Sequence, residues 1–145
     1  MTVSIAQVHA DQAAQVKESM AMLKTKLNAL GAPKLVDGVI SFGTTEINGN
    51  YDVVDEVADA HDCTATVFMK KDDGFQRIAT NVIKEGKRAI GTMLDPNGPA
   101  IPMIRKGEAY YGEADILGSK YETGYEPIKN AAGETIGVYY VGYKK

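Results

Sequence analysis

The sequence contains no tryptophan, a single cysteine and two histidines, and these shortages exclude several kinds of site. Because Cys63 has no second cysteine to pair with, no internal disulfide can form. A zinc site needs three or four converging ligands, and His9 and His61 do not form a paired metal-binding motif. A lone cysteine in strand-like surroundings is usually a small buried apolar residue. We therefore expect no metal and no cofactor, and we interpret His61 and Cys63 as structural.

Charge and long apolar segments are also in short supply. The 145 residues carry a formal net charge of −3, so the chain lacks the positive field of nucleic-acid-binding proteins, and we expect no nucleic-acid partner. No apolar run approaches the roughly 20 residues that span a bilayer, and no signal peptide is evident. If the protein acts outside the cytoplasm, we expect this chain to be one part of a longer one.

Common catalytic motifs are missing as well. The sequence has no phosphate-binding GxxxxGK[ST], no GxSxG and no HExxH motif, and its glycines are spaced as turn and bulge residues. No clear pair of groups for acid–base catalysis stands out. We predict that the protein is not an enzyme.

The N-terminal part of the chain has the apolar period of an amphipathic helix. A stripe recurs at spacings of three and four residues and consists of Ala13, Val16, Met20, Leu23, Leu27 and Leu30. Gly31 and Pro33 follow as a helix stop, so we predict a helix over residues 4–30 within an N-terminal helical segment 1–31. The narrow stripe fits two interpretations: a helix packed on its own sheet, or a stalk that also pairs with a second copy as a weak homodimer.

Residues 35–145 have the composition of an antiparallel sheet, and with the helix they form a single α+β domain over residues 1–145. Short helices are expected after Asn50, which could cap the first, and from Ala100 to Lys106, where Pro102 must lie in the first turn. Turn residues separate the predicted strands, which are 35–47, 62–70, 75–82, 88–94, 109–116, 119–128 and 134–143.

An arginine lies in the middle of the predicted strand 75–82. A period of two places Phe75, Arg77, Ala79 and Asn81 on one face of this strand. Arg77 has two interpretations: a surface or ion-paired side chain, or a planar fork that faces a pocket and binds a carboxylate with two hydrogen bonds.

Tyrosines gather on the predicted strand 119–128. Tyr121, Thr123 and Tyr125 share one face of that strand, while Tyr110 and Tyr111 lie on opposite faces of the preceding one, so at most one of them can join the set. A tyrosine combines an apolar wall with a hydroxyl donor, which suits a pocket for a short polar ligand. The alternative is an ordinary core in which each hydroxyl is satisfied.

Five motifs in the C-terminal half resemble the single-Cache sensor domains of bacterial methyl-accepting chemotaxis receptors. They cover about half of the chain and read R-x-A-T, G-T-x-L-D-P, G-x-A-x-I-L-G, Y-x-x-x-Y-x-P-I and G-x-x-I-G-x-x-Y-V-G. The resemblance implies a PAS-like domain, with a long N-terminal helix packed on a five-stranded antiparallel sheet and short helices covering a pocket. It also implies flanking membrane segments and a periplasmic position in an inner-membrane receptor.

The resemblance further implies a ligand and a site. The family binds small metabolites, often short organic acids, between the sheet and its covering loops. Carried onto this sequence, the ligand-binding residues are Arg77, Tyr121, Thr123 and Tyr125, with Tyr110 as a looser match. Some relatives recognise amines through an aspartate motif that is not found here, which favours a small carboxylate.

We therefore expect the extracytoplasmic ligand-binding domain of a chemoreceptor, which signals across the membrane by conformational change. Three alternatives stay open. The domain could belong to a histidine kinase or cyclase, it could be a small stand-alone enzyme, or it could be a purely structural dimerisation module with a filled core.

Overall fold

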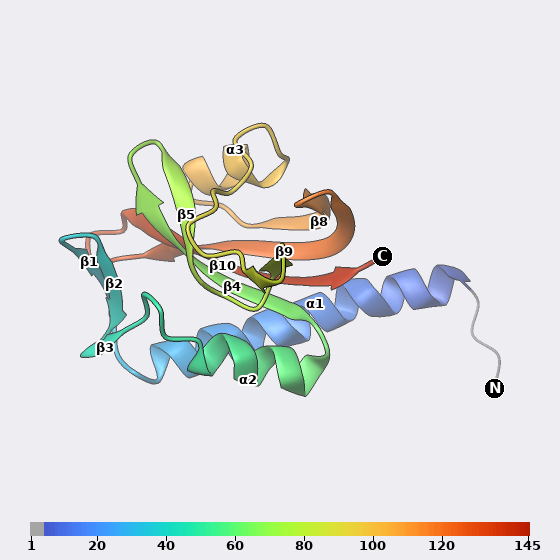
Figure 1. Cartoon of the computed structure of the whole chain (residues 1–145), viewed down its shortest axis with the longest axis horizontal. Helices are drawn as coiled ribbons and strands as arrows, with labels where there is room; N and C mark the ends of the chain where they lie inside the picture. The colour runs from blue at the N-terminus through green and yellow to red at the C-terminus, as the bar shows by residue number, and fades with distance from the viewer. Residues whose placement is uncertain (1–4) are drawn as a thin grey trace.

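The computed structural model describes residues 5–145, with side chains from residue 11 onward (Figure 1). The predicted positions before residue 5 and the side chain of His9 lie outside the described residues. The elements, in chain order, are α1 (Ile5–Asn28), β1 (Pro33–Val36), β2 (Val39–Phe42), β3 (Thr45–Glu46), α2 (Asp52–His61), β4 (Thr64–Lys71), β5 (Gly74–Thr80), β6 (Ile83–Lys84), β7 (Lys87–Arg88), α3 (Ala100–Arg105), β8 (Tyr110–Ile116), β9 (Ser119–Lys129) and β10 (Thr135–Lys144).

A five-stranded antiparallel sheet in the order β5-β4-β10-β9-β8 is the centre of the domain. The long helix α1 and the short helix α2 lie on one face of this sheet, and α3 lies on the other (Figure 1). A small sheet β1-β2-β3 and the β6–β7 hairpin lie at its margins. The predicted α+β class and the PAS-like five-stranded sheet are confirmed. Within residues 5–145, no helix has both the length and the apolar character needed to cross a membrane.

The apolar stripe of α1 is used mainly against the chain's own sheet. Val16, Met20, Leu23 and Leu27 are at most 1% exposed, whereas the stripe's C-terminal residue, Leu30, is 41% exposed. A burial of this extent leaves the four central positions unavailable to a second helix in the same conformation. The first interpretation of the stripe therefore holds for its centre, and the weak homodimer stays a prediction.

The face under α1 and α2 forms a helix-side cluster. A polar pair is buried within it, because Ser19 Oγ and Tyr143 Oη lie 2.9 Å apart and Ser19 also donates to the Gln15 carbonyl. Cys63 packs at the margin of the cluster, where burial raises the pKa of its thiol to about 11. The apolar residues that α1, α2 and the central strands contribute include Val16, Met20, Leu23, Leu27, Val54, Val57, Ala65, Val67, Met69, Ile128, Tyr139 and Val141.

The opposite face forms a pocket-side cluster beneath α3. Ile101 and Ile104 of α3 pack here against aromatic side chains of the central strands. Only α3, of the two short helices, lies on this face; α2 packs beside α1. The buried members of the cluster are Phe68, Phe75, Val82, Ala89, Leu94, Ala100, Ile101, Ile104, Ala114, Ile116, Tyr125, Val138 and Tyr140.

A β-bulge in β5 overturns the expected facing of that strand. Val67 of β4 pairs with Ala79 but Phe68 pairs with Arg77, so Ile78 is the extra residue. Arg77 therefore faces the pocket side, and Ile78 and Ala79 both join the helix-side cluster. The prediction that Arg77 and Ala79 share a face was wrong, because strict alternation cannot anticipate an inserted residue.

The predicted strand 35–47 is divided by two turns into β1, β2 and β3. Two further local predictions were also wrong. Residues 89–94 form a loop after β7 rather than a regular strand, joined to β5 by an isolated bridge between Met93 and Gln76; Gly91 has a φ of +87°, and Thr92 Oγ1 donates to the Ala89 carbonyl. The N-cap of α2 is Tyr51 rather than Asn50, although the Asn50 side chain accepts the Asp52 backbone N–H at 3.1 Å. In both places a local side-chain or turn hydrogen bond determines the backbone path.

The close approach of β10 to β4 predicts a strongly destabilising substitution. A Cβ at Gly137 would overlap the Phe68 carbonyl oxygen of the neighbouring strand. Gly137→Ala should lower the free energy of unfolding by about 3 kcal/mol or more, because the central strands must separate. Urea unfolding measures this. Gly133→Asn is the control, since the β9–β10 turn has open space and asparagine tolerates its φ of +82°; an equal loss in both variants would contradict the steric argument.

The raised pKa of Cys63 predicts a slowly reacting thiol. Because only the thiolate is nucleophilic, native Cys63 should react with iodoacetamide at pH 8 about ten-fold or more slowly than the same residue in urea-unfolded chain. The rate should rise up to about pH 11. Mass spectrometry of labelled protein follows both reactions. Equal rates in the native and unfolded chains would show that Cys63 is neither buried nor perturbed.

Candidate functional site

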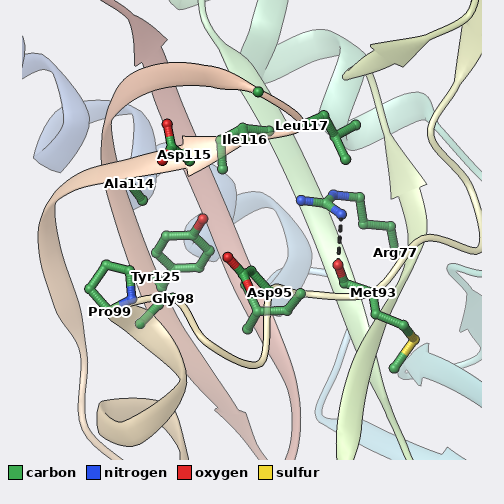
Figure 2. Close-up of a pocket in the computed structure, with 13 residues that line it drawn as sticks. Arg77, Met93, Asp95, Gly98, Pro99, Ala114, Asp115, Ile116, Leu117 and Tyr125 are labelled. Atoms are coloured by element: carbon green, nitrogen blue, oxygen red, sulfur yellow. Dashed lines mark hydrogen bonds between the residues drawn. The ribbon is translucent and has the colours of Figure 1, made fainter.

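A cavity of about 250 Å³ opens on the pocket side of the sheet (Figure 2). Its walls come from β5, from the loop that leads into α3 and the first residue of α3, from the end of β8 and the β8–β9 turn, and from one residue of β9. The lining residues are Arg77, Met93, Leu94, Asp95, Gly98, Pro99, Ala100, Ala114, Asp115, Ile116, Leu117, Gly118 and Tyr125. Most of this wall is apolar, so the few polar groups determine what charge the cavity accepts.

Arg77 extends from β5 into the cavity and is only 4% exposed. Its Nη1 donates to Thr92 Oγ1 at 3.0 Å and to the Met93 carbonyl at 3.2 Å. The guanidinium carbon lies 4.9 Å from the centre of the Phe68 ring, a cation–π contact. The backbone of Arg77 also exchanges hydrogen bonds with the same loop, from its N–H to the Thr92 carbonyl and from the Gly91 N–H to its own carbonyl. The loop and the strand thus hold the guanidinium from one side.

No carboxylate neutralises this cation within the described part of the chain. Arg77 takes part in none of the ion pairs there, and its Nε is buried without a hydrogen-bond partner. Burial lowers the pKa of the Arg77 guanidinium, opposed by the nearby hydroxyls of Tyr125 and Tyr140. An arginine nevertheless stays protonated in proteins. The cavity therefore contains a buried, incompletely satisfied positive charge.

Tyr125 stands across the cavity from Arg77 (Figure 2) and is 1% exposed. Its ring lies in an aromatic cluster, with centroid distances of 5.0 Å to Tyr140, 6.3 Å to Tyr110 and 6.4 Å to Phe68. Burial raises the pKa of Tyr125, although Arg77 acts in the opposite direction. The phenol therefore stays neutral and keeps its proton as a hydrogen-bond donor.

The other three residues expected at the site do not line this cavity. Thr123 is fully buried, and its hydroxyl donates to the Gly112 carbonyl of β8 at 2.6 Å. Tyr110 donates to the Glu113 carbonyl at 2.7 Å, and its ring touches the site only through Tyr125. Tyr121 packs at the edge of the pocket-side cluster. The structure thus brings Arg77 and Tyr125 together at the cavity and leaves the other three out of its lining.

Residues that sequence reasoning did not assign complete the wall. They come from two motifs, G-T-x-L-D-P at residues 91–96 and G-x-A-x-I-L-G at residues 112–118. Asp95 belongs to the first; its Oδ1 accepts the Asn97 N–H at 2.9 Å, and its carbonyl accepts the Gly98 N–H at 3.1 Å. These motifs were visible as family signatures, but their loops gave no periodic pattern from which facing could be read.

The remaining candidates offer no comparable site. Among the described residues, no three His, Cys, Asp or Glu side chains gather in a way that could hold a metal. A second, wider groove of about 780 Å³ is lined by charges of both signs, including Lys70, Arg105, Asp73 and Glu134, all of which are exposed. Exposed charges of opposite sign provide no buried recognition group.

Comparison with known proteins agrees with this geometry. No curated protein matches the chain. The family described as the Cache 3/Cache 2 fusion domain matches it over residues 1–145. The five-stranded sheet, the long N-terminal helix and the cavity on the pocket side of the sheet are consistent with a Cache-type ligand-binding domain. The chain therefore belongs to the Cache 3/Cache 2 fusion domain family and is an extracytoplasmic sensor domain.

Proposed function

We propose that this domain is the ligand-binding part of an inner-membrane chemoreceptor and that it detects a small carboxylate held by Arg77. One observation carries the proposal: a guanidinium that is 4% exposed faces a cavity with no carboxylate partner among the described residues. A buried charge is costly unless it is paired and hydrogen-bonded. An anionic ligand supplies both the missing charge and the missing acceptors.

The geometry of Arg77 favours a particular edge for the ligand. Nη1 is directed at Thr92 and Met93, so the edge formed by Nε and Nη2 is the one left for a ligand (Figure 2). Two carboxylate oxygens match this edge with parallel hydrogen bonds. The phenol of Tyr125, across the cavity, supplies a neutral donor for a further polar atom of the ligand. A carboxylate with few heavy atoms suits a space of about 250 Å³.

The chemoreceptor assignment is supported by the motif resemblance described above. A histidine kinase or cyclase sensor would use the same binding physics, so the output domain of the full-length protein distinguishes the two. In either case the signal must leave the pocket side of the sheet and reach α1.

A route for that signal begins at the loop that holds Arg77. The loop follows β7, where Arg88 binds both carboxylate oxygens of Asp55 on α2 at 2.7 and 2.8 Å and lies over the Tyr51 ring. Helix α2 in turn packs on α1 and adds an ion pair between Glu56 and Lys26. A carboxylate bound to Arg77 competes with the loop for the hydrogen bonds of the guanidinium. This competition shifts the position of the loop. We propose that Arg88 transmits this shift to α2 and α1.

The ligand proposal predicts a stabilisation that depends on Arg77. A ligand at 100 times its Kd should add about 2.7 kcal/mol to the free energy of unfolding, or several degrees in Tm. A thermal-shift screen with acetate, propionate, lactate, pyruvate, malate, succinate and citrate should give a clear shift with at least one acid. Arg77→Ala should abolish the shift, and Arg77→Lys should restore it only in part because the bidentate geometry is lost.

The matched control for this experiment is Arg105→Ala. This substitution also removes one positive charge, but from an exposed side chain that donates a hydrogen bond to the Asp73 carbonyl. The acid-induced shift in Tm should therefore persist. Full affinity in Arg77→Ala, measured by calorimetry, would show that the acid binds elsewhere and would refute the site assignment.

The signalling route predicts that binding and transmission can be separated. Asp55→Asn breaks the two-oxygen pair with Arg88 and should leave the affinity for the acid within about three-fold, since neither residue lines the cavity. The ligand-dependent change in a fluorophore attached at exposed position 21 of α1 should become markedly smaller. Lys120→Ala, which breaks a surface pair with Glu113, is the control. An undiminished signal in Asp55→Asn would rule out this route.

A further inference from the structure

We infer that the ligand carries a single carboxylate on a short, largely apolar body, and that Asp95 excludes acids with a second carboxylate. This inference deepens the carboxylate function proposed above and rests on it. It names a class of ligand and assigns a specificity-determining role to one residue of the cavity wall.

The charges around the cavity are unequal. Three charged residues line it, one cation and two anions: Arg77, Asp95 and Asp115. The cation is 4% exposed and its Nε has no hydrogen-bond partner, so it can bind one carboxylate. Among the described residues, a second carboxylate on the ligand finds no second cation in the wall. The rest of the lining is Met93, Leu94, Gly98, Pro99, Ala100, Ala114, Ile116, Leu117, Gly118 and Tyr125.

The two aspartates contribute differently. Strand alternation turns the side chains of Ala114 and Ile116 toward the cavity, where both are buried, and turns the exposed side chain of Asp115 to the other side of β8 (Figure 2). Asp95 is also exposed, but its side chain lies between Arg77 and Tyr125 at the edge of the cavity (Figure 2). Its position is fixed by the hydrogen bond from the Asn97 N–H. Asp95 is therefore the carboxylate that a bound ligand meets.

The small size of the cavity brings the second carboxylate of a diacid toward Asp95. When one carboxylate is bound to Arg77, a space of about 250 Å³ keeps a second one close to Asp95. Two like charges at such a distance repel each other, and the water that reaches the exposed Asp95 side chain reduces this repulsion without removing it. Specificity of this kind comes from a repulsive element set against the wrong ligand. A short aliphatic body, in contrast, contacts Leu94, Ile116 and Leu117 without penalty.

Titration calorimetry of the 145-residue chain with different acids, at constant pH and ionic strength, tests the inference. Propionate and butyrate should bind the wild-type protein about ten-fold or more tightly than succinate and malate. Asp95→Asn should raise the affinity for the diacids relative to the monoacids by about ten-fold, because the repulsion is gone and the turn's acceptor oxygen is kept. Asp115→Asn removes the same charge from a side chain turned away from the cavity and should leave the ratio within about two-fold.

Asp95→Ser serves as a second variant if Asp95→Asn does not fold. The serine hydroxyl can also accept the hydrogen bond from the Asn97 N–H and so preserve the turn. Diacids that bind wild-type protein as tightly as monoacids, or a ratio that neither Asp95 variant changes, would overturn the inference while the carboxylate function stands. If no acid of either class binds the wild-type or the Asp95 variants, the proposed function itself fails. A ratio that shifts in the Asp95 variants and not in Asp115→Asn supports the charge filter.

Discussion

The contact on which the site depends is the burial of the Arg77 guanidinium between Phe68 and the loop of residues 91–94. Two oxygens of the loop accept hydrogen bonds from Arg77 Nη1, and the Phe68 ring packs against the face of the guanidinium. Together these contacts hold a positive charge in an apolar wall without an ion partner among the described residues. Such an arrangement is unfavourable by itself, because burial disfavours the charge. An anionic ligand that pairs with Arg77 supplies the countercharge and the hydrogen-bond acceptors that the protein alone does not provide.

The sheet is what allows one chain to hold both this site and a structural core. Adjacent residues of β10 serve opposite faces: Tyr139 belongs to the helix-side cluster, and Tyr140 belongs to the pocket-side cluster beside Tyr125. A single layer of sheet therefore separates the cavity from α1. A packed interior transmits small displacements because it has few voids to absorb them. The Arg88–Asp55 pair adds a second connection that goes around the edge of the sheet rather than through it.

Regular patterns predicted the regular parts of the fold. The three-and-four spacing of Val16, Met20, Leu23 and Leu27 predicted both α1 and the face it buries, and alternation along β9 placed Tyr121 and Tyr125 on the pocket side. Alternation failed at β5, where the bulge adds one residue and reverses the facing of Ala79. It also could not show that the Thr123 hydroxyl is consumed by the Gly112 carbonyl, since a hydrogen bond between strands depends on register. The sequence thus indicates which face of the sheet a side chain occupies, but it does not indicate whether the polar atoms of that side chain are free to bind a ligand.

The irregular parts of the site were marked in the sequence by motifs rather than by periodicity. Six consecutive residues, 91–96, supply the hydroxyl and the carbonyl that hold Arg77 and also the carboxylate of Asp95. The R-x-A-T motif supplies Arg77 itself together with the bulge that directs it into the cavity. Placing a cation and an anion on two segments that are hydrogen-bonded to each other fixes their relative position more firmly than separate loops could. The spacing between Arg77 and Asp95 thereby becomes a property of the backbone, and it sets how much negative charge a ligand of this cavity can carry.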